Sequence, residues 1–410
     1  MFKYFIAVQG DLKMKYDFTS IIDRTGKDAL ALDFIPVKDA EIKEGFSKIP
    51  MWVADMNFAT VPTIQESIIN RVHHPAFGYF IPRKEYYRAI IAWHRERYKN
   101  EMPAADDIGY ENGVLGALAS AVNAFSAPGE AVLLHSPTYI GFTNVLESNG
   151  RRIILTDLVR DGKGIWRMDY ADMDRKIKKY KIHFCIFCSP HNPAGRVWEK
   201  EEIEKAMDVY KNNDCIVFSD EIWADITLGN GHIPTQSVSE DAKQRTIAAY
   251  APSKTFNLAG LIGSYHIVYN KYLKDRLRRQ EELTHYNSMN VLSMYALLGA
   301  YTKEGALWVD ELNEVLKANV EWAYSFITAH FEGVSLAKPE GTYMLYLDCE
   351  EWCAKHGKSL DELLKDGISV GVIWQDGRPF NRPWSIRMNL ALPFSQLSEA
   401  FGRLDKYVFN

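Results

Sequence analysis

The sequence predicts an α/β protein with a large domain built on a mostly parallel, doubly wound sheet and a smaller α+β domain. Short apolar runs alternate with stretches of helical spacing through the middle of the chain, as in a parallel sheet covered by helices. Beyond residue 295 the pattern changes to a long amphipathic helical region and an alternating strand. We therefore expect an N-terminal arm at 1–60 that contributes to the small domain, a large domain at 61–295 and a small domain at 296–410.

The individual elements follow from periodicity and from turn residues. A proline at its opening turn and helically spaced apolar residues predict a helix at 62–73, and an aromatic helix follows at 84–99. A glycine-bearing loop at 112–118 leads into a helix that runs through Phe125. Strands are then predicted at 131–134, 152–159, 183–188, 215–218, 246–250 and 264–269, with helices at 170–180 and 199–212. The small domain is expected to hold a helix at 304–331 and a strand at 341–347.

Composition excludes several kinds of partner. The 410 residues are 47% hydrophobic and carry a net charge of −5 without a basic run, which argues against nucleic acid and anionic membranes. No apolar stretch is long enough to span a bilayer, and the apolar run at the start is too short for a secretory leader. We therefore expect a cytoplasmic protein.

The cysteines and histidines give no sign of a disulfide framework or a metal site. Five cysteines are an odd number, and the pair Cys185 and Cys188 lies within a predicted buried strand, where positions i and i+3 point to opposite faces. Core packing is the favoured interpretation, because a free cysteine behaves as a small hydrophobe. The eleven histidines include no H-E-x-x-H motif. No metal is predicted.

Three polar loops follow three of the predicted strands. They are S-P-H-N-P-A-G at 189–195, S-D-E-I-W-A-D at 219–225 and A-P-S-K-T-F-N at 251–257. In open α/β sheets, ligands bind outside the carboxyl ends of the strands. We therefore expect Asn192, Asp220 and Lys254 to converge on one small molecule.

An amide, a carboxylate and a lysine together suit pyridoxal 5′-phosphate. Lys254 would hold the aldehyde as a Schiff base and later move the substrate's Cα proton. Asp220 would keep the pyridine nitrogen protonated, and Asn192 would hydrogen-bond the ring's phenolic oxygen. Each residue has an ordinary alternative: a solvated lysine, an N-P-x-G turn, or Asp220 and Glu221 as helix caps. The ordered trio after three strands favours the cofactor.

At this point the sequence resembles a known family. The stretch S-K-T-F-N-L-A-G-L around Lys254, together with M-W-V-A-D-M-N-F at 51–58 and F-G-Y at 77–79, resembles the fold-type I aminotransferases and, within them, the cystathionine β-lyase-like C-S lyases. The resemblance implies the fold of type I pyridoxal phosphate-dependent transferases, with the cofactor in the large domain. M-K-Y-D-F at Met14 resembles the usual beginning of that family, so residues 1–13 are interpreted as an upstream extension.

The resemblance also assigns further residues around the phosphate and the ring. Val114 and Leu115 lie in the glycine-bearing loop that enters a helix, where unpaired N-H groups and the positive end of the helix dipole suit the phosphate. Ser253 would donate to the same phosphate, and Tyr139 would stack on the pyridine face. Tyr79 would reach the phosphate of the neighbouring subunit, which implies a homodimer with shared active sites.

Arg387, in R-M-N-L-A, would bind the α-carboxylate of an amino acid substrate, and Asn192 would contact the same substrate. Three positions depart from the family pattern. Asn57 stands where the family has Asp, Gly116 replaces a proline, and Trp223 occupies a place where histidine is common.

Two reactions use these residues equally well. The resemblance to C-S lyases favours β-elimination on L-cystathionine or related cysteine S-conjugates, which gives a thiol, pyruvate and ammonia. The alternative is an aminotransferase that acts on an amino acid and a 2-oxo acid. A third class, a protein that binds the cofactor but acts through a protein partner, has no interaction tail or repeat in its favour.

Overall fold

The computed structural model describes residues 14–99, 103–285 and 288–410. The extension predicted for residues 1–13 lies outside this part of the chain. Contacts divide the described chain into a large unit, Pro62–Gly305 with Glu340–Thr342, and a small unit made of the chain up to Val61, Ala306–Pro339 and Tyr343–Asn410. The domain boundaries predicted at residues 61 and 295 stay a prediction.

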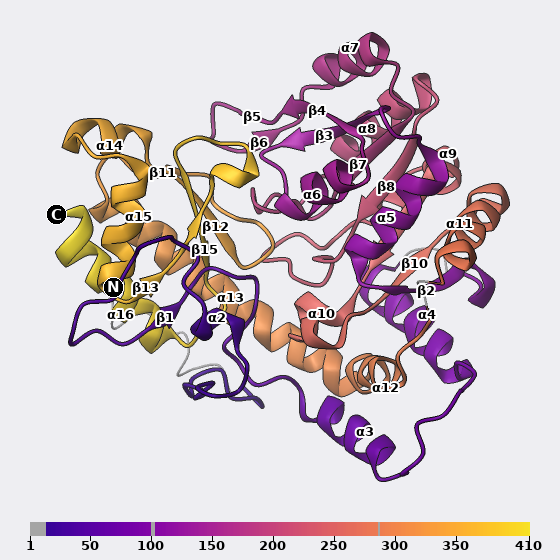
Figure 1. The fold of residues 1–410 in the computed structure, drawn as a ribbon, viewed down its shortest axis with the longest axis horizontal. Helices are drawn as coiled ribbons and strands as arrows, with labels where there is room; N and C mark the ends of the chain where they lie inside the picture. The colour runs from indigo at the N-terminus through magenta and orange to yellow at the C-terminus, as the bar shows by residue number, and fades with distance from the viewer. Residues whose placement is uncertain (1–13, 100–102, 286–287) are drawn as a thin grey trace. The chain divides into compact units, whose positions relative to one another are not determined.

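The large unit is built on a seven-stranded sheet of order β2-β10-β9-β8-β7-β3-β4 (Figure 1). The strands are β2 (Ile108–Asn112), β3 (Ala131–Ser136), β4 (Arg152–Asp157), β7 (Phe184–Cys188), β8 (Ile216–Asp220), β9 (Thr246–Tyr250) and β10 (Gly263–Ile267). The ladders from β9 through β8, β7 and β3 to β4 are parallel, whereas β10 runs antiparallel to β9 and β2. The central strands β7 and β9 are buried on both faces, which matches their mostly apolar sequences.

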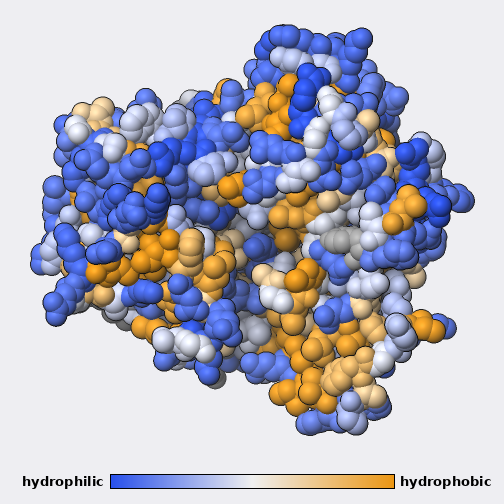
Figure 2. All heavy atoms as spheres, viewed as in Figure 1, coloured by the Kyte–Doolittle hydropathy of each residue, from blue (hydrophilic) through white to orange (hydrophobic). Residues whose placement is uncertain are grey.

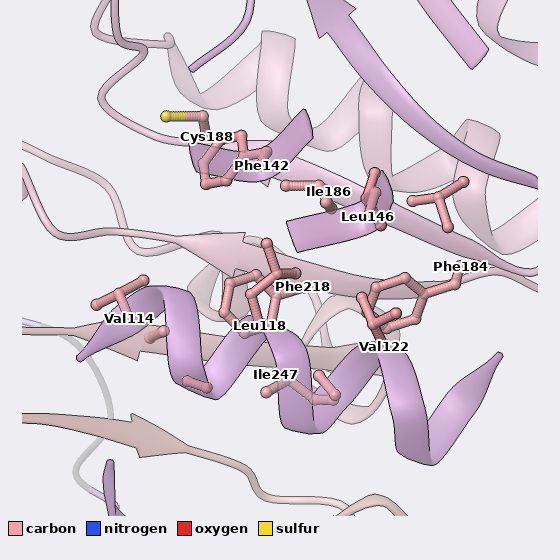
Figure 3. Close-up of a cluster of buried hydrophobic side chains, with 14 of the residues drawn as sticks. Val114, Leu118, Val122, Phe142, Leu146, Phe184, Ile186, Cys188, Phe218 and Ile247 are labelled. Atoms are coloured by element: carbon pink, nitrogen blue, oxygen red, sulfur yellow. The ribbon is translucent and has the colours of Figure 1, made fainter. Parts of the chain in front are cut away.

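Helices cover this sheet. They are α5 (Val114–Phe125), α6 (Ile140–Ser148), α7 (Tyr170–Tyr180), α8 (Lys200–Asn212), α9 (Glu240–Arg245), the one-turn α10 (Pro252–Thr255) and α11 (Lys271–Thr284), with α3 (Pro62–Val72), α4 (Lys84–Tyr98) and α12 (Val291–Ala300) as further helices. The spacing of Val114, Leu118 and Val122 puts these side chains on one face of α5. There they join a buried core with Phe218 and Ile247 of the sheet (Figure 3).

The small unit has a four-stranded sheet of order β11-β12-β15-β14. Its strands are β11 (Ser335–Leu336), β12 (Met344–Asp348), β14 (Gln375–Asp376) and β15 (Ser385–Asn389), and β1 (Ile49–Pro50) pairs with β13 (Val372–Ile373). Its helices are α2 (Leu30–Asp33), α14 (Glu350–His356), α15 (Leu360–Ser369) and α16 (Phe394–Leu404), and α13 (Lys303–His330) contributes most of its length. Inside this unit, Asn319 Nδ2 donates to the carbonyls of Leu390 and Leu392 at 3.0 Å.

Most of the predicted elements are confirmed, with three corrections. The stretch predicted as a loop at 112–118 is already helical from Val114, where α5 begins. The strand predicted at 152–159 ends at Asp157, and Val159–Arg160 forms a separate strand β5 that pairs with β6 (Trp166–Arg167). The strand predicted at 341–347 begins at Met344, because Gly341 and Thr342 bond instead to the backbone around Ile226 in the large unit. All five cysteines are free and buried, which confirms core packing. Within the described ranges, the helices are all too short or too polar to cross a bilayer.

Candidate active site

Three parallel strands end at the same level of the sheet. Cys188 at the end of β7 pairs with Asp220 at the end of β8, and Asp220 pairs with Ala249 of β9. The loops that leave these ends carry Asn192 and Lys254, with Asp220 at the last position of its strand. The structure therefore brings the predicted trio to one edge of the sheet.

The helical turn that carries Lys254 is fixed by a buried carboxylate. Thr255 Oγ1 donates to Asp225 Oδ2 at 3.0 Å. The other oxygen of Asp225 accepts from Trp93 Nε1 at 3.1 Å and from the Tyr98 hydroxyl at 2.9 Å, both on α4. Because Thr255 follows Lys254 directly, these bonds hold the backbone of the lysine in place. Nothing in the sequence marked Asp225 for this task.

The amine of Lys254 lies beside an indole ring. Its Nζ is 5.9 Å from the centre of the Trp223 ring, and Trp223 is only 2% exposed. A cation at this distance is attracted to the face of the ring. Ser253, the predicted phosphate donor, is half-buried on the same short helix. The departure from the family pattern at Trp223 therefore lies directly at the lysine.

Asp220 is a buried carboxylate with few partners. Its Oδ1 accepts from the backbone N-H of Ile222 at 3.0 Å, and its Oδ2 accepts no hydrogen bond from the described residues. Burial, together with the neighbouring charge of Glu221, raises the pKa of Asp220 to about 7, although the hydrogen bond from Ile222 and the charge of Lys254 oppose the shift. A protonated ring nitrogen would supply the missing donor and positive charge, so the residues present fit pyridoxal phosphate.

The next residue, Glu221, has the opposite surroundings. It is buried, and its oxygens accept from His232 Nε2 at 2.6 Å, the Tyr250 hydroxyl at 2.7 Å and Ser219 Oγ at 2.9 Å, and from a backbone N-H at 3.1 Å. Burial alone would raise the pKa of Glu221, but the hydrogen bonds and charge of its partners lower it. Glu221 is thus not the helix cap considered from the sequence; it is an ionised group inside the core.

Asn192 lies in a tight, well-supported loop. It is buried, and around it the N-H of His191 donates to the carbonyl of Arg196 at 2.8 Å while the N-H of Gly195 donates back to His191 at 2.7 Å. Arg196 is itself buried and pairs with Glu202 of α8. These bonds within the loop hold Asn192 beyond the end of β7.

The residues predicted near the phosphate and the ring also lie close to one another. Gly113, with a φ of 82°, precedes α5, so that Val114 and Leu115 form the first turn, whose N-H groups lack partners within the helix. Tyr139 precedes α6 and is half-buried. A Cβ at Gly141 would lie 2.4 Å from Cε1 of Tyr139 and 2.8 Å from Cδ1 of Leu115. Glycine at 141 therefore allows Tyr139 and Leu115 to approach each other.

Tyr79 lies in an exposed segment that follows α3. Its side chain is fully exposed, as is most of Ile81, and Phe77 is 55% exposed. Phe77 and Tyr79 line an open cleft of about 490 Å³ together with Tyr87 and Tyr110. Figure 2 shows apolar atoms gathered at the lower edge of this unit, where Figure 1 places α3 and the chain that follows it. Contact of Tyr79 with a second subunit stays a prediction.

Arg387, on β15 of the small unit, is 3% exposed. Its guanidinium lies 4.6 Å from the centre of the Phe380 ring, and its Nη2 donates to the carbonyl of Trp52 at 3.3 Å. An arginine on a strand is usually exposed and ion-paired. Burial of Arg387 and its contact with the Phe380 ring should hold the guanidinium in one orientation.

Asn57, in the same unit, is one of the three positions where the sequence predicted a departure from the family pattern. It is 6% exposed, its Nδ2 donates to the carbonyl of Pro50 at 3.4 Å, and its Oδ1 accepts from Arg24 Nη1 at 3.2 Å. The second Nη of Arg24 pairs with Asp55 at 2.6 Å. The amide thus bridges a backbone carbonyl, which needs a donor, and a guanidinium, which needs an acceptor.

Comparison with known proteins identifies the family. The family model described as aminotransferase class I and II matches residues 50–404. This chain belongs to that family. The family and fold class predicted from the sequence are therefore confirmed.

This chain is similar to three proteins that have names or titles of their own. Cystathionine beta-lyase PatB of Bacillus subtilis is 30% identical over 359 residues, which cover 87% of this chain and 91% of that protein. Protein MalY of Escherichia coli is 29% identical over 399 residues, covering 95% and 98%. The crystal structure of cystalysin from Treponema denticola, which contains a pyridoxal 5′-phosphate cofactor, superposes with a TM-score of 0.88 at 29% identity and covers 96% of this chain and 98% of its own.

Proposed function

We propose that this protein catalyses pyridoxal phosphate-dependent β-elimination on L-cystathionine or related cysteine S-conjugates, with a thiol, pyruvate and ammonia as products. The cofactor and the carbon-sulfur lyase class predicted from the sequence agree with the family and with the relatives named above. The lysine amine and the buried carboxylate at one edge of the sheet support the cofactor. The observation that favours elimination over transamination is the similarity to cystathionine beta-lyase PatB.

Each residue of the trio has a separate task in this proposal. Pyridoxal phosphate, when bound, supplies an electron sink for the electrons left by a departing proton. The amine of Lys254 would hold the cofactor's aldehyde and, as a free amine, would take the proton from the substrate's Cα. Asp220 holds a proton at the ring nitrogen, and Asn192 donates to the phenolic oxygen and contacts the substrate.

The remaining residues bind and orient. The N-H groups of Val114 and Leu115 and the hydroxyl of Ser253 bind the phosphate, and Tyr139 stacks on the ring. We propose that Tyr79 of a second copy completes this phosphate site, which requires a homodimer. Arg387 binds the substrate's carboxylate with its guanidinium. The cytoplasmic location stays a prediction.

The experiment separates elimination from transamination. The purified protein is incubated with L-cystathionine and with a panel of S-alkyl cysteines, without any 2-oxo acid, and pyruvate, ammonia and free thiol are measured. We expect many turnovers of pyruvate formation. Activity that appears only after a 2-oxo acid is added would contradict the proposal and would favour the aminotransferase alternative.

A further inference from the structure

A second cluster of ligating side chains lies inside the large unit, on other elements than the lysine loop. Glu111 comes from β2, His266 from the antiparallel neighbour β10, and Glu281 from α11. One ligand atom from each residue lies within 4.8 Å of the others. The three residues are 0%, 1% and 2% exposed respectively, so the cluster is closed to bulk water.

The atoms of this cluster face one another. His266 Nδ1 lies 2.7 Å from Glu111 Oε1 and 3.8 Å from Glu281 Oε1. The second oxygen of Glu111, Oε2, is buried and accepts no hydrogen bond from the part of the chain that the structure describes. A buried carboxylate oxygen without a donor is costly, which points to a positive group between the side chains.

The backbone makes room for this arrangement. Gly109 of β2 lies opposite His266 in the ladder. A Cβ at Gly109 would come within 2.2 Å of the imidazole ring. Any other residue at 109 would push His266 out of the cluster, so the glycine is part of what builds it.

The nearby cations are already matched by other acids. On α11, the Lys274 amine lies 3.0 Å from Asp106 and 2.8 Å from Asp107, and Arg278 lies 3.1 Å from Asp106. Two positive charges thus face two aspartates of the preceding turn. His266 lies beside both glutamates of the cluster, and a divalent cation among the three side chains would balance both carboxylate charges.

We propose that Glu111, His266 and Glu281 bind one divalent metal ion of the zinc type. Two carboxylate oxygens and one imidazole nitrogen are ligands that Zn²⁺ accepts, with water in a fourth position. Glu111 uses the free Oε2, and His266 uses Nδ1 as a neutral imidazole whose proton sits on Nε2. The ion would join the β2-β10 edge of the sheet to α11, a structural role independent of the proposed lyase reaction.

The wild-type holoenzyme tests this directly. After dialysis against a chelator, it is titrated with Zn²⁺ by calorimetry, and bound metal is measured by elemental analysis. We expect saturable uptake of about one ion per chain and a higher Tm with Zn²⁺, because an ion that binds only the folded state stabilises it. No saturable uptake would overturn the proposal and would mean that the two carboxyl groups share a proton instead.

Variants locate the ion. Glu281→Gln and Gly109→Ala should each weaken Zn²⁺ affinity by more than about tenfold, the first by removing a ligand and the second by displacing the His266 ring. Glu282→Gln is the matched control, since it makes the same change one residue along α11 on an exposed side chain. If Glu281→Gln binds Zn²⁺ as tightly as Glu282→Gln does, the ion is elsewhere and the proposal fails.

Discussion

Asp220 and Glu221 are adjacent in the chain and equally buried, yet their surroundings differ. Glu221 receives three side-chain donors and a backbone N-H, and its pKa lies below the usual value. Asp220 receives one backbone N-H from the described chain, and burial raises its pKa to about 7. The difference indicates that the protein itself satisfies the hydrogen-bonding capacity of the Glu221 carboxylate, whereas the surroundings of Asp220 suit a cationic ligand.

The largest effect is expected on the Asp220 side, at the lysine that faces it. Lys254→Ala should lower the rate of pyruvate formation more than about 1000-fold, because the group that moves the Cα proton is removed. The visible absorbance of the lysine-bound cofactor should also disappear, which spectrophotometry measures. Lys271→Ala, on an exposed side chain, is the control and should change neither quantity. A Lys254→Ala protein with full absorbance and activity would break the central assignment.

Asp220→Asn comes next. The amide keeps the shape of the carboxylate but cannot hold a proton on the ring nitrogen by charge, so kcat should fall about 100-fold while the thermal unfolding of the holoenzyme stays cooperative. The measurement is kcat together with the unfolding curve. An unchanged kcat would mean that Asp220 does not face the cofactor.

Glu221→Gln should affect stability more than chemistry. The amide loses the charge that pairs with His232 and places an N-H among groups that are themselves donors, so the free energy of unfolding should fall by about 1–3 kcal/mol. The cofactor's absorbance maximum should stay near that of the wild type. If this variant instead keeps its stability and loses only kcat, the contrast between the two carboxylates is wrong.

The sequence predicted the residues grouped with Asp220 but not the hydrogen-bond donors of Glu221, and the reason is physical. Apolar runs in the sequence predict parallel strands, and the carboxyl ends of parallel strands lie at the same edge of a sheet. Asn192, Asp220 and Lys254 could therefore be predicted to lie together. The donors of Glu221 come from loops and strands whose approach depends on tertiary packing. Local sequence patterns do not predict contacts that depend on tertiary packing.

The same limit applies to the buried Glu111, His266 and Glu281 cluster. Glu111 and His266 are 155 residues apart in the sequence, and the three residues lie on two strands and a helix. No motif with a fixed spacing of metal ligands could therefore identify them. Trp223 was visible in the sequence as a departure, but its contact with the lysine amine was not. The assignment of Tyr79 to a second subunit rests on resemblance, and the exposure of its side chain is what such a role requires.

A pH series distinguishes the two carboxylates in the cofactor-free protein. The folded pKa of Asp220, about 7, lies above its ordinary value of 3.8, so the folded state holds this proton more tightly than the unfolded state does. Between these pH values wild-type protein should therefore lose stability relative to Asp220→Asn as pH rises, by no more than about 1.4 kcal/mol per pH unit. Urea unfolding at a series of pH values measures this difference. Bound cofactor should remove the trend, because a protonated ring nitrogen beside Asp220 favours its ionised form; a trend that persists in the holoenzyme would mean that the cofactor does not reach Asp220.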